Sequence, residues 1–290
     1  MRNIFLVLIT CLTISCGRGV PDSGNKIITV SIAPFKYFVD EIAGNDFTVN
    51  IMVPAGADPH TYEPFPEQIN KLRKSVAYIS NGYLGFEMNW LDRFYETNAT
   101  MKRLSLGDKI KPLTSVHHRE GEHIEGADPH YWVSPECALI MALSLKEFLC
   151  ELNPEQKRKY EAGYQNLISK IQEVDYKARE LFSGISNKSF MIYHPNLAYI
   201  ARDYGLEEIP VEFEGKEPPP SRMRELIDRA RKDKLRTIFV QREYDTKNAK
   251  AIAGEIGAQV ILIDPLSENW QKSTIDIIEA LHESLIESSK

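Results

Sequence analysis

The stretch Gly56–His60 reads Gly-Ala-Asp-Pro-His, and the same five residues recur at Gly126–His130. An aromatic residue follows within two positions, Tyr62 in the first copy and Tyr131 in the second, but the sequences beyond differ, so the repeat is not a duplicated domain. The proline fixes its own φ and biases the aspartate before it towards extended backbone, while the glycine permits a sharp turn. The motif therefore predicts two histidines that are held rigidly, and we interpret them as two metal ligands.

Strands and helices alternate around the first motif. Short runs rich in β-branched residues predict strands over 26–32, 47–53 and 75–80, and segments with helical spacing of apolar residues separate them. This β-α-β-α-β order is typical of a parallel sheet covered by helices. His60 follows the second strand, and ligands of such sheets bind beyond the carboxyl ends of the strands. The helices are expected over 33–44, 66–74 and 86–95.

The same alternation resumes after Gly184. Four strand-like runs are separated by segments with helical spacing, and one of these helices ends before Gly257, a residue type that commonly follows a helix. The pattern predicts a second α/β lobe. Its strands are expected over 189–193, 208–213, 237–240 and 259–263, and its helices up to 205 and over 222–232, 245–256 and 274–288.

A proline-free stretch, 155–181, separates the two halves of the chain. Its apolar residues recur at helical spacing, and a continuous helix of this length spans roughly 40 Å. Such a helix can cross a pair of lobes and fix their relative orientation. We therefore expect an α/β protein with two parallel-sheet lobes, 26–152 and 185–290, joined by one long rigid helix within 153–184.

The composition is that of an ordinary globular protein. Of the 290 residues, 43% are hydrophobic and 26% are charged, which is enough apolar surface for a sizeable core. The formal net charge of −6 gives no support to nucleic-acid binding through a basic face, so no nucleic-acid partner is expected. We expect the protein to be a monomer.

Residues 1–15 have the form of a signal peptide, in which Arg2 precedes a largely apolar run. Cys16 follows a small residue at the end of that run, as in a bacterial lipoprotein signal, although Thr13 stands where leucine is usual. We expect cleavage before Cys16, lipidation of its thiol and a flexible tether over 16–25. This leader predicts a membrane-anchored lipoprotein in the periplasm or on the cell surface. The alternative is ordinary secretion, with Cys16 incidental.

Cys137 and Cys150 are the cysteines that remain once this leader is set aside. Thirteen helical residues separate them by roughly 20 Å, which is too far for a disulfide bond. We expect both to pack as small buried hydrophobic residues.

Four candidate metal ligands follow a strand or precede a helix. They are His60 and His130 in the first half of the chain and His194 and Asp264 in the second. Three imidazoles and one carboxylate suit Zn²⁺, which binds nitrogen, sulfur and oxygen in tetrahedral geometry. A lone histidine is more often structural or exposed, and that interpretation stays open for each of them. His282, on the last expected helix, is such a residue.

The residues around the two motifs suggest supporting roles. Asp58 and Asp128 could cap the turns that follow them or accept hydrogen bonds from the neighbouring imidazoles. Tyr62, Tyr131 and Trp132 are expected to pack around the site and limit the access of water.

Five segments of the chain carry a resemblance to a known family. Together they cover nearly the whole chain after the leader, and they resemble the metal-binding solute-binding proteins of bacterial ABC importers, the zinc/manganese class. The segments are VPAGADPHTYEPFPEQINKL (53–72), GADPHYWVSPECALIMALSL (126–145), YHPNLAYIARDYGL (193–206), EGKEPPPSRM (214–223) and TKNAKAIAGEIGAQVILIDPLS (246–267).

The resemblance implies a metal ion held in the cleft between two lobes, delivery of that ion to a membrane permease, and no catalysis. It also implies His60, His130 and His194 as ligands, with Asp264 or water in the fourth position. Members of the class for manganese tend to have glutamate at the third position, and zinc members have histidine. Because imidazole suits zinc better than manganese, His194 favours Zn²⁺, with Mn²⁺ or Fe²⁺ as the alternatives.

A short loop, 116–125, precedes the second motif and contains His117, His118 and His123. Zinc-type members of the class often carry a loop rich in histidine and acidic residues at this place. We interpret it as an accessory metal loop that captures zinc weakly and passes it inward. A solvated loop without a metal role is the alternative.

Two further functions are compatible with parts of the sequence. A secreted zinc hydrolase would use three histidines and an open fourth position to activate water, but the chain contains neither H-E-x-x-H nor G-x-S-x-G. An adhesin is the second, because surface members of the class are associated with that role. The sequence has no repeats or binding module that support it.

Overall fold

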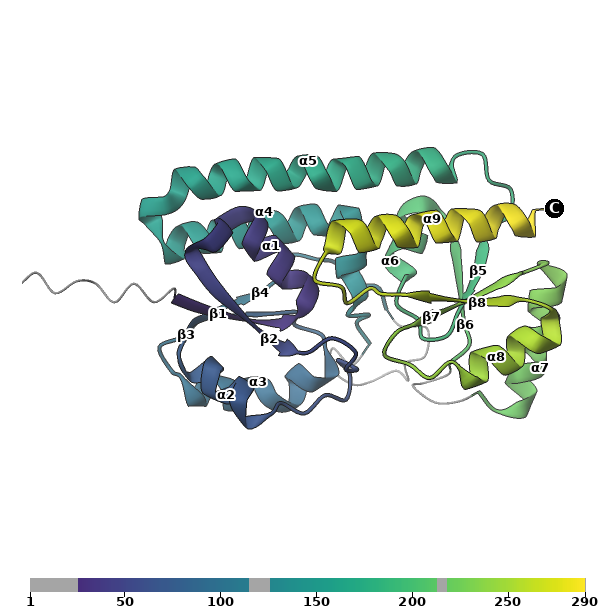
Figure 1. The fold of residues 1–290 in the computed structure, drawn as a ribbon, viewed down its shortest axis with the longest axis horizontal. Coiled ribbons are helices and arrows are strands. Elements are labelled where there is room, and N and C mark those ends of the chain that lie inside the picture. The colour runs from purple at the N-terminus through teal and green to yellow at the C-terminus, as the bar shows by residue number, and fades with distance from the viewer. Residues whose placement is uncertain (1–25, 115–125, 213–217, 290) are drawn as a thin grey trace, which may run out of the picture.

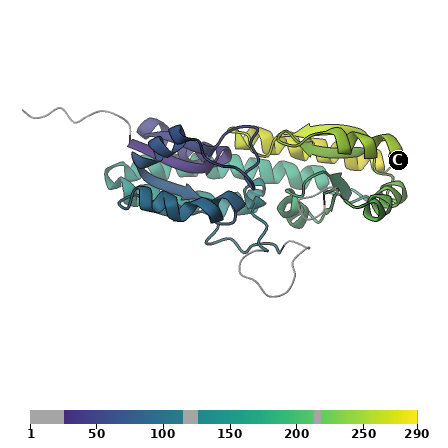
Figure 2. The ribbon, with the colours of Figure 1, turned by 90° about the horizontal axis from the view of Figure 1, so that it is seen from below.

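The computed structural model describes residues 26–114, 126–212 and 218–289. Two lobes lie side by side along the long axis of the molecule, and a long helix runs over both of them (Figures 1 and 2). Each lobe is built on one four-stranded sheet in which all paired strands are parallel. The predicted architecture of two parallel-sheet α/β lobes joined by one long helix is confirmed.

The N-terminal lobe has the strand order β2-β1-β3-β4. Its elements are β1 (Lys26–Ile32), α1 (Ala33–Ala43), β2 (Phe47–Val53), α2 (Pro66–Arg73), β3 (Ser75–Ser80), α3 (Gly85–Thr97), β4 (Lys102–Ser105) and α4 (Pro135–Leu152). Helices α1 and α4 lie on one side of the sheet and α2 and α3 on the other (Figure 1), so β1 and β3 are almost wholly buried. The sequence predicted three strands here. It missed β4, because this short edge strand is polar and partly exposed and lacks an apolar pattern.

The C-terminal lobe repeats this arrangement with the strand order β6-β5-β7-β8. Its elements are β5 (Ser189–Ile192), α6 (Ala198–Tyr204), β6 (Glu207–Pro210), α7 (Pro220–Lys232), β7 (Thr237–Gln241), α8 (Lys247–Ile256) and β8 (Gln259–Ile263). Helix α8 ends at Gly257, whose φ of 65° is left-handed, as its sequence predicted. A second hydrophobic core fills the space between this sheet and the helices α7 and α8.

The long helix is α5 (Lys157–Phe182), which follows a 3₁₀ turn at Pro154–Gln156. Its 26 residues span about 39 Å. It packs against α1 and α4 and then against α9 (Trp270–Ser288). Helix α9 begins four residues before the predicted start because the side chain of Asn269 caps it by accepting from Lys272 N. The ends of α4 and α5 support a proposed division into N-terminal lobe, linking segment and C-terminal lobe at 26–152, 153–184 and 185–290.

Buried contacts fix the two lobes relative to each other. The indole of Trp132, in the N-terminal lobe, donates to the carbonyl of Pro265 at 2.9 Å, and the indole of Trp270 donates to the carbonyl of Trp132 at 2.6 Å. The Tyr199 hydroxyl donates to the carbonyl of Asp128 at 2.8 Å. One hydrophobic core also continues under α5 and α9 from the first lobe into the second. These contacts favour a rigid pair of lobes.

The two cysteines of the described residues differ in burial. Cys137 is buried as predicted, but Cys150 is half-buried, so that prediction is wrong for the second residue; both are free thiols.

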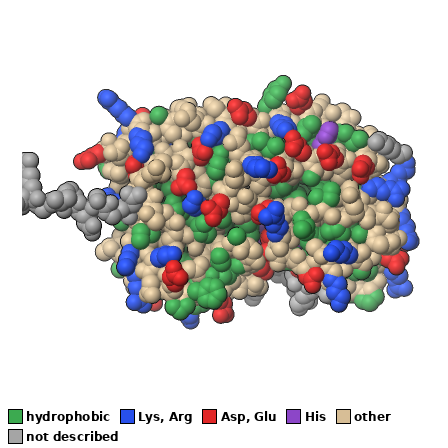
Figure 3. Space-filling view, viewed as in Figure 1, with side chains coloured by type: hydrophobic (Ala, Val, Ile, Leu, Met, Phe, Trp, Pro, Cys, Tyr) green, Lys and Arg blue, Asp and Glu red, His purple; other side chains and the backbone are tan. Residues whose placement is uncertain are grey.

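On the face shown in Figure 3, Lys and Arg side chains are interspersed with Asp and Glu over both lobes, and no continuous basic surface forms there. Within the described ranges, no helix combines the length and apolar character that crossing a membrane requires.

Candidate metal centre

Three histidines from distant parts of the chain converge between the lobes. His60 lies in the loop after β2, His130 starts a 3₁₀ turn just before α4, and His194 follows β5. The ring centroids are 5.1 Å apart for His60 and His130, 5.0 Å for His60 and His194, and 5.2 Å for His130 and His194. In the described part of the chain, these three histidines form a possible metal-binding group, because their ligand atoms all lie within 4.8 Å of one another.

The spacing of these nitrogens fits a single metal ion. Nε2 of His60 and Nε2 of His130 lie 3.1 Å apart. Zinc–nitrogen bonds of about 2.0–2.1 Å in tetrahedral geometry place two ligand nitrogens about 3.3 Å apart. Since no ligand atom is farther than 4.8 Å from another, the rings need to close by at most about 1.5 Å to share one zinc ion. The three residues can therefore hold such an ion without rearrangement of the lobes.

The two Gly-Ala-Asp-Pro-His motifs fold in the same way. In each, the aspartate Oδ1 accepts a hydrogen bond at 2.8 Å from the backbone N–H of the histidine two residues later. Oδ1 of Asp128 also contacts Nδ1 of His130 at 2.8 Å, whereas the other oxygen of Asp58 accepts from the Thr61 hydroxyl at 3.1 Å. Both aspartates cap their turns, and Asp128 also orients an imidazole.

The turn after β3 supports both motif loops. Asn81 donates from its side chain to the carbonyl of Pro129 at 3.0 Å, one residue before the second histidine of the site. The fully buried carboxylate of Glu87 accepts from the backbone N–H groups of Asn81 and Gly82 at 2.7 Å and 2.6 Å. At the start of α3, Gly85 packs so closely on the His60 carbonyl that a Cβ there would lie 2.7 Å from the oxygen. This support was not predicted from the sequence, because Asn81, Gly85 and Glu87 lie outside the two motifs.

His194 is held by three side chains of its own lobe. Nδ1 of His194 lies 2.5 Å from Oε2 of Glu212, just beyond β6. Gln241, at the end of β7, donates to the His194 carbonyl, and the ring of Tyr244 stacks on the imidazole at 4.9 Å and 19°. None of these three residues was predicted. Their positions after neighbouring strands were the available signal, because such positions meet at one edge of a parallel sheet.

The electrostatic environment keeps two of the imidazoles neutral. Burial lowers the pKa of His60 well below 6.5, and the neighbouring His130 and His194 lower it further. Burial also lowers the pKa of His130, although the Asp128 carboxylate acts in the opposite direction. Neutral imidazole is the form that binds a metal ion, so these rings are available as ligands at neutral pH.

The structure does not bring the fourth predicted ligand into the histidine group. Asp264 follows β8 as expected, but its Oδ2 lies 3.5 Å from Nη1 of Arg242 and its side chain is about one-third exposed. Glu243, which the sequence did not single out, interacts with both Asp264 and His194. Burial, reinforced by the charge of Asp264, raises the pKa of Glu243 to about 7. Glu243 thus lies near both His194 and Asp264.

The remaining predicted residues divide into three groups. Trp132 packs beside His130, with ring centroids 5.3 Å apart. Tyr131 and Tyr62 instead pack on other aromatic rings of the N-terminal lobe. The predicted accessory loop and lipidation site lie outside the described residues: His117, His118, His123 and Cys16.

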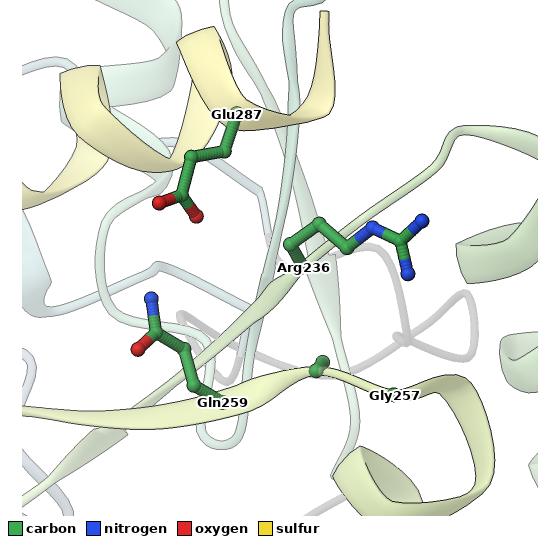
Figure 4. A pocket seen from close by; sticks show the side chains of 5 residues that line it. Arg236, Gly257, Gln259 and Glu287 are labelled. Atoms are coloured by element: carbon green, nitrogen blue, oxygen red, sulfur yellow. The ribbon is translucent and has the colours of Figure 1, made fainter. Parts of the chain in front are cut away.

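Two surface cavities contain none of the three histidines in their lining. The pocket in Figure 4 is lined by Arg236, Gly257 and Gln259 at the amino ends of β7 and β8, together with Glu287 of α9. The histidines gather at the opposite, carboxyl ends of the strands. A smaller groove of about 280 Å³ lies beside Asp264.

Comparison with known proteins identifies the family. Residues 28–287 match the family described as zinc-uptake complex component A, periplasmic. The zinc-binding lipoprotein AdcA of Streptococcus pneumoniae is 25% identical over 289 residues, which cover 94% of this chain and 57% of AdcA. The chain thus spans little more than half the length of that relative.

Two solved structures are similar over almost their whole length. A crystal structure of ZnuA is 35% identical and has a TM-score of 0.84, with 90% of this chain and 100% of that chain covered. A ZnuA deletion mutant with zinc bound has the same identity and TM-score, with 98% of its chain covered. The matched family consists of transport components and not enzymes, which agrees with the prediction of a non-enzymatic protein. The chain belongs to the family of periplasmic component A proteins of zinc-uptake complexes.

Proposed function

We propose that this chain captures Zn²⁺ outside the cytoplasm and delivers it to the membrane permease of an ABC importer. The observation that carries the proposal is the convergence of three imidazoles from both lobes at one point. The zinc-binding names of AdcA and of the ZnuA structure with bound zinc support the same ion. Imidazole nitrogen also suits zinc better than manganese, which prefers oxygen ligands, so Mn²⁺ and Fe²⁺ are the alternatives.

His60, His130 and His194 are the proposed ligands, with Asp264 or water in the fourth position. Because buried contacts hold the lobes together, loading requires movement of the imidazoles by at most about 1.5 Å rather than opening of the cleft. Bound zinc links side chains of the two lobes and stabilises the folded state by mass action. The protein acts as a monomer.

The leader and the accessory loop have proposed roles in the same process. Lipidation of Cys16 anchors the protein at a membrane through the tether 16–25, and the loop with His117, His118 and His123 captures zinc weakly. Deletion of 117–123 should slow zinc uptake at limiting zinc while leaving the affinity of the main site unchanged. Equal uptake by the deletion variant would count against the capture role.

The metal assignment is tested with the full chain, purified in detergent. Metal content and competitive affinities for zinc and manganese are measured for the wild type, His194→Glu and the control His282→Ala, which changes a histidine on α9 away from the site. We expect one tightly held zinc ion, preferred over manganese, in the wild type and the control, and a weaker preference in His194→Glu. No bound metal, or a preference for manganese in the wild type, would refute the zinc assignment.

A further inference from the structure

We propose that Glu212 positions His194 for metal binding by holding its imidazole in the tautomer that leaves Nε2 free as a ligand. The inference rests on the proposed function, because it assigns a role in zinc binding to a residue that is not itself a ligand. The juxtaposition that carries it is the contact of 2.5 Å between Nδ1 of His194 and Oε2 of Glu212.

The chemistry of this contact fixes where the proton lies. The two side chains are only 12% and 10% exposed, so water does not compete strongly for either group. An ionised carboxylate only accepts hydrogen bonds, and Nδ1 must therefore carry the proton. In a neutral imidazole, the other nitrogen then has the free lone pair. Nε2 of His194 is indeed buried and has no hydrogen-bond partner in the part of the chain that the structure describes.

The other groups that hold His194 do not select the tautomer. Gln241 binds the backbone of His194, through its N–H and its carbonyl, and Tyr244 stacks on the face of the ring. Stacking and backbone contacts place the ring plane but leave either nitrogen free to carry the proton. Glu212 is itself held in place, since its backbone N–H donates to the carbonyl of Tyr193 at 2.9 Å. The carboxylate therefore stands on a fixed strand end beside the imidazole.

Glu212 acts behind the ring and not as a ligand. Nδ1 and Nε2 point in different directions from the imidazole, so a carboxylate on Nδ1 lies away from an ion on Nε2. Asp128 stands in the same relation to His130 in the other lobe, with its Oδ1 2.8 Å from Nδ1. Each lobe thus places one negative charge behind one imidazole, and together the two carboxylates offset the charge of a divalent cation. Groups of this kind fix the ligand orientation, and their loss weakens metal binding about 10–100-fold.

The test compares Glu212→Ala and Glu212→Gln with the wild type as full chains, using zinc itself as the probe. Glu207→Gln is the matched control, because Glu207 lies on β6 but pairs with Arg229 at the surface. Zinc dissociation constants are measured by competition, and the protonated nitrogen of His194 is read by ¹⁵N NMR of the histidines before zinc is added. Thermal melting shows that each variant is folded.

We expect Glu212→Ala to weaken zinc binding about 10–100-fold and to lose the single tautomer with a proton on Nδ1. Glu212→Gln should recover most of the affinity and the tautomer, because its amide oxygen still accepts from Nδ1. The control should match the wild type. Should Glu212→Ala not fold, Glu212→Asp, which keeps the charge but shortens the reach, must show the same loss of tautomer.

Three results would overturn the inference. They are wild-type zinc affinity in Glu212→Ala, equal losses in Glu212→Ala and Glu212→Gln, and a wild-type His194 protonated on Nε2. The proposed function fails separately, when the wild type binds no zinc. Even then, the NMR measurement still decides whether Glu212 fixes the tautomer of His194.

Discussion

The substitution Gly85→Ala should damage the metal site by moving the backbone that carries one ligand. A Cβ at Gly85 would lie 2.7 Å from the carbonyl oxygen of His60, whereas real Cβ contacts are not closer than 3.0 Å and usually exceed 3.4 Å. Helix α3 is anchored by buried side chains, so the loop must yield. The His60 carbonyl therefore withdraws by about 0.3–0.7 Å, which adds to the movement of up to about 1.5 Å that the imidazoles already need to share one ion.

We expect Gly85→Ala to lower the zinc affinity at least tenfold, or about 1.4 kcal/mol. Overpacking typically costs about 1–3 kcal/mol of stability, and the low end applies here because the displaced atom sits in a loop. A zinc competition titration and melting with and without zinc separate the two effects. The control is Gly254→Ala in α8, where a Cβ meets no atom within 4 Å and the helix gains up to about 1 kcal/mol. Wild-type zinc affinity in Gly85→Ala would refute the reasoning.

Three other predictions concern the lobes and the pH. Trp270→Phe removes the buried donor to the Trp132 carbonyl and should lower the free energy of unfolding by about 1–3 kcal/mol in a urea titration. An unchanged free energy would contradict a stabilising role of this hydrogen bond between the lobes. Gly163→Ala places a Cβ 2.4 Å from the backbone of α1, so the melting temperature should fall, and an unchanged one would argue against this close packing. The lowered pKa values of His60 and His130 keep both rings neutral at pH 6.5. Zinc affinity should therefore stay constant from pH 7.5 to 6.5 and fall at lower pH. A tenfold loss of affinity between pH 7.5 and 6.5 would contradict this prediction.

Most of the fold could be predicted because it follows from local patterns. The parallel strands are continuous apolar runs, the helices carry apolar residues at helical spacing, and the 26-residue helix α5 contains no proline. The misses occur where the local pattern is weak. Strand β4 is a polar edge strand that pairs with β3, and α9 starts earlier than predicted because Asn269 caps it.

The candidate site was predictable in part. The repeated motif indicated rigid histidines, and its aspartates do cap both turns. His194 was found from its place after a strand. The structure leaves Asp264 outside the histidine group, near Arg242, and a position after a strand could not show this. Proximity along a sheet edge selects candidates, but side-chain packing decides which of them meet.

The sequence by itself determined the two α/β lobes, the long helix and the rigid presentation of His60 and His130, because each depends on residues close together in the chain. Only the tertiary structure decided which groups stand around those imidazoles. Glu212 meets His194 across 18 residues, Glu87 meets Ser31 across 56, and His60 meets His130 across 70. Such contacts arise when strands are ordered in a sheet and two lobes pack together. Their polar partners leave no periodic trace in the sequence, since a single carboxylate among many is selected by geometry alone.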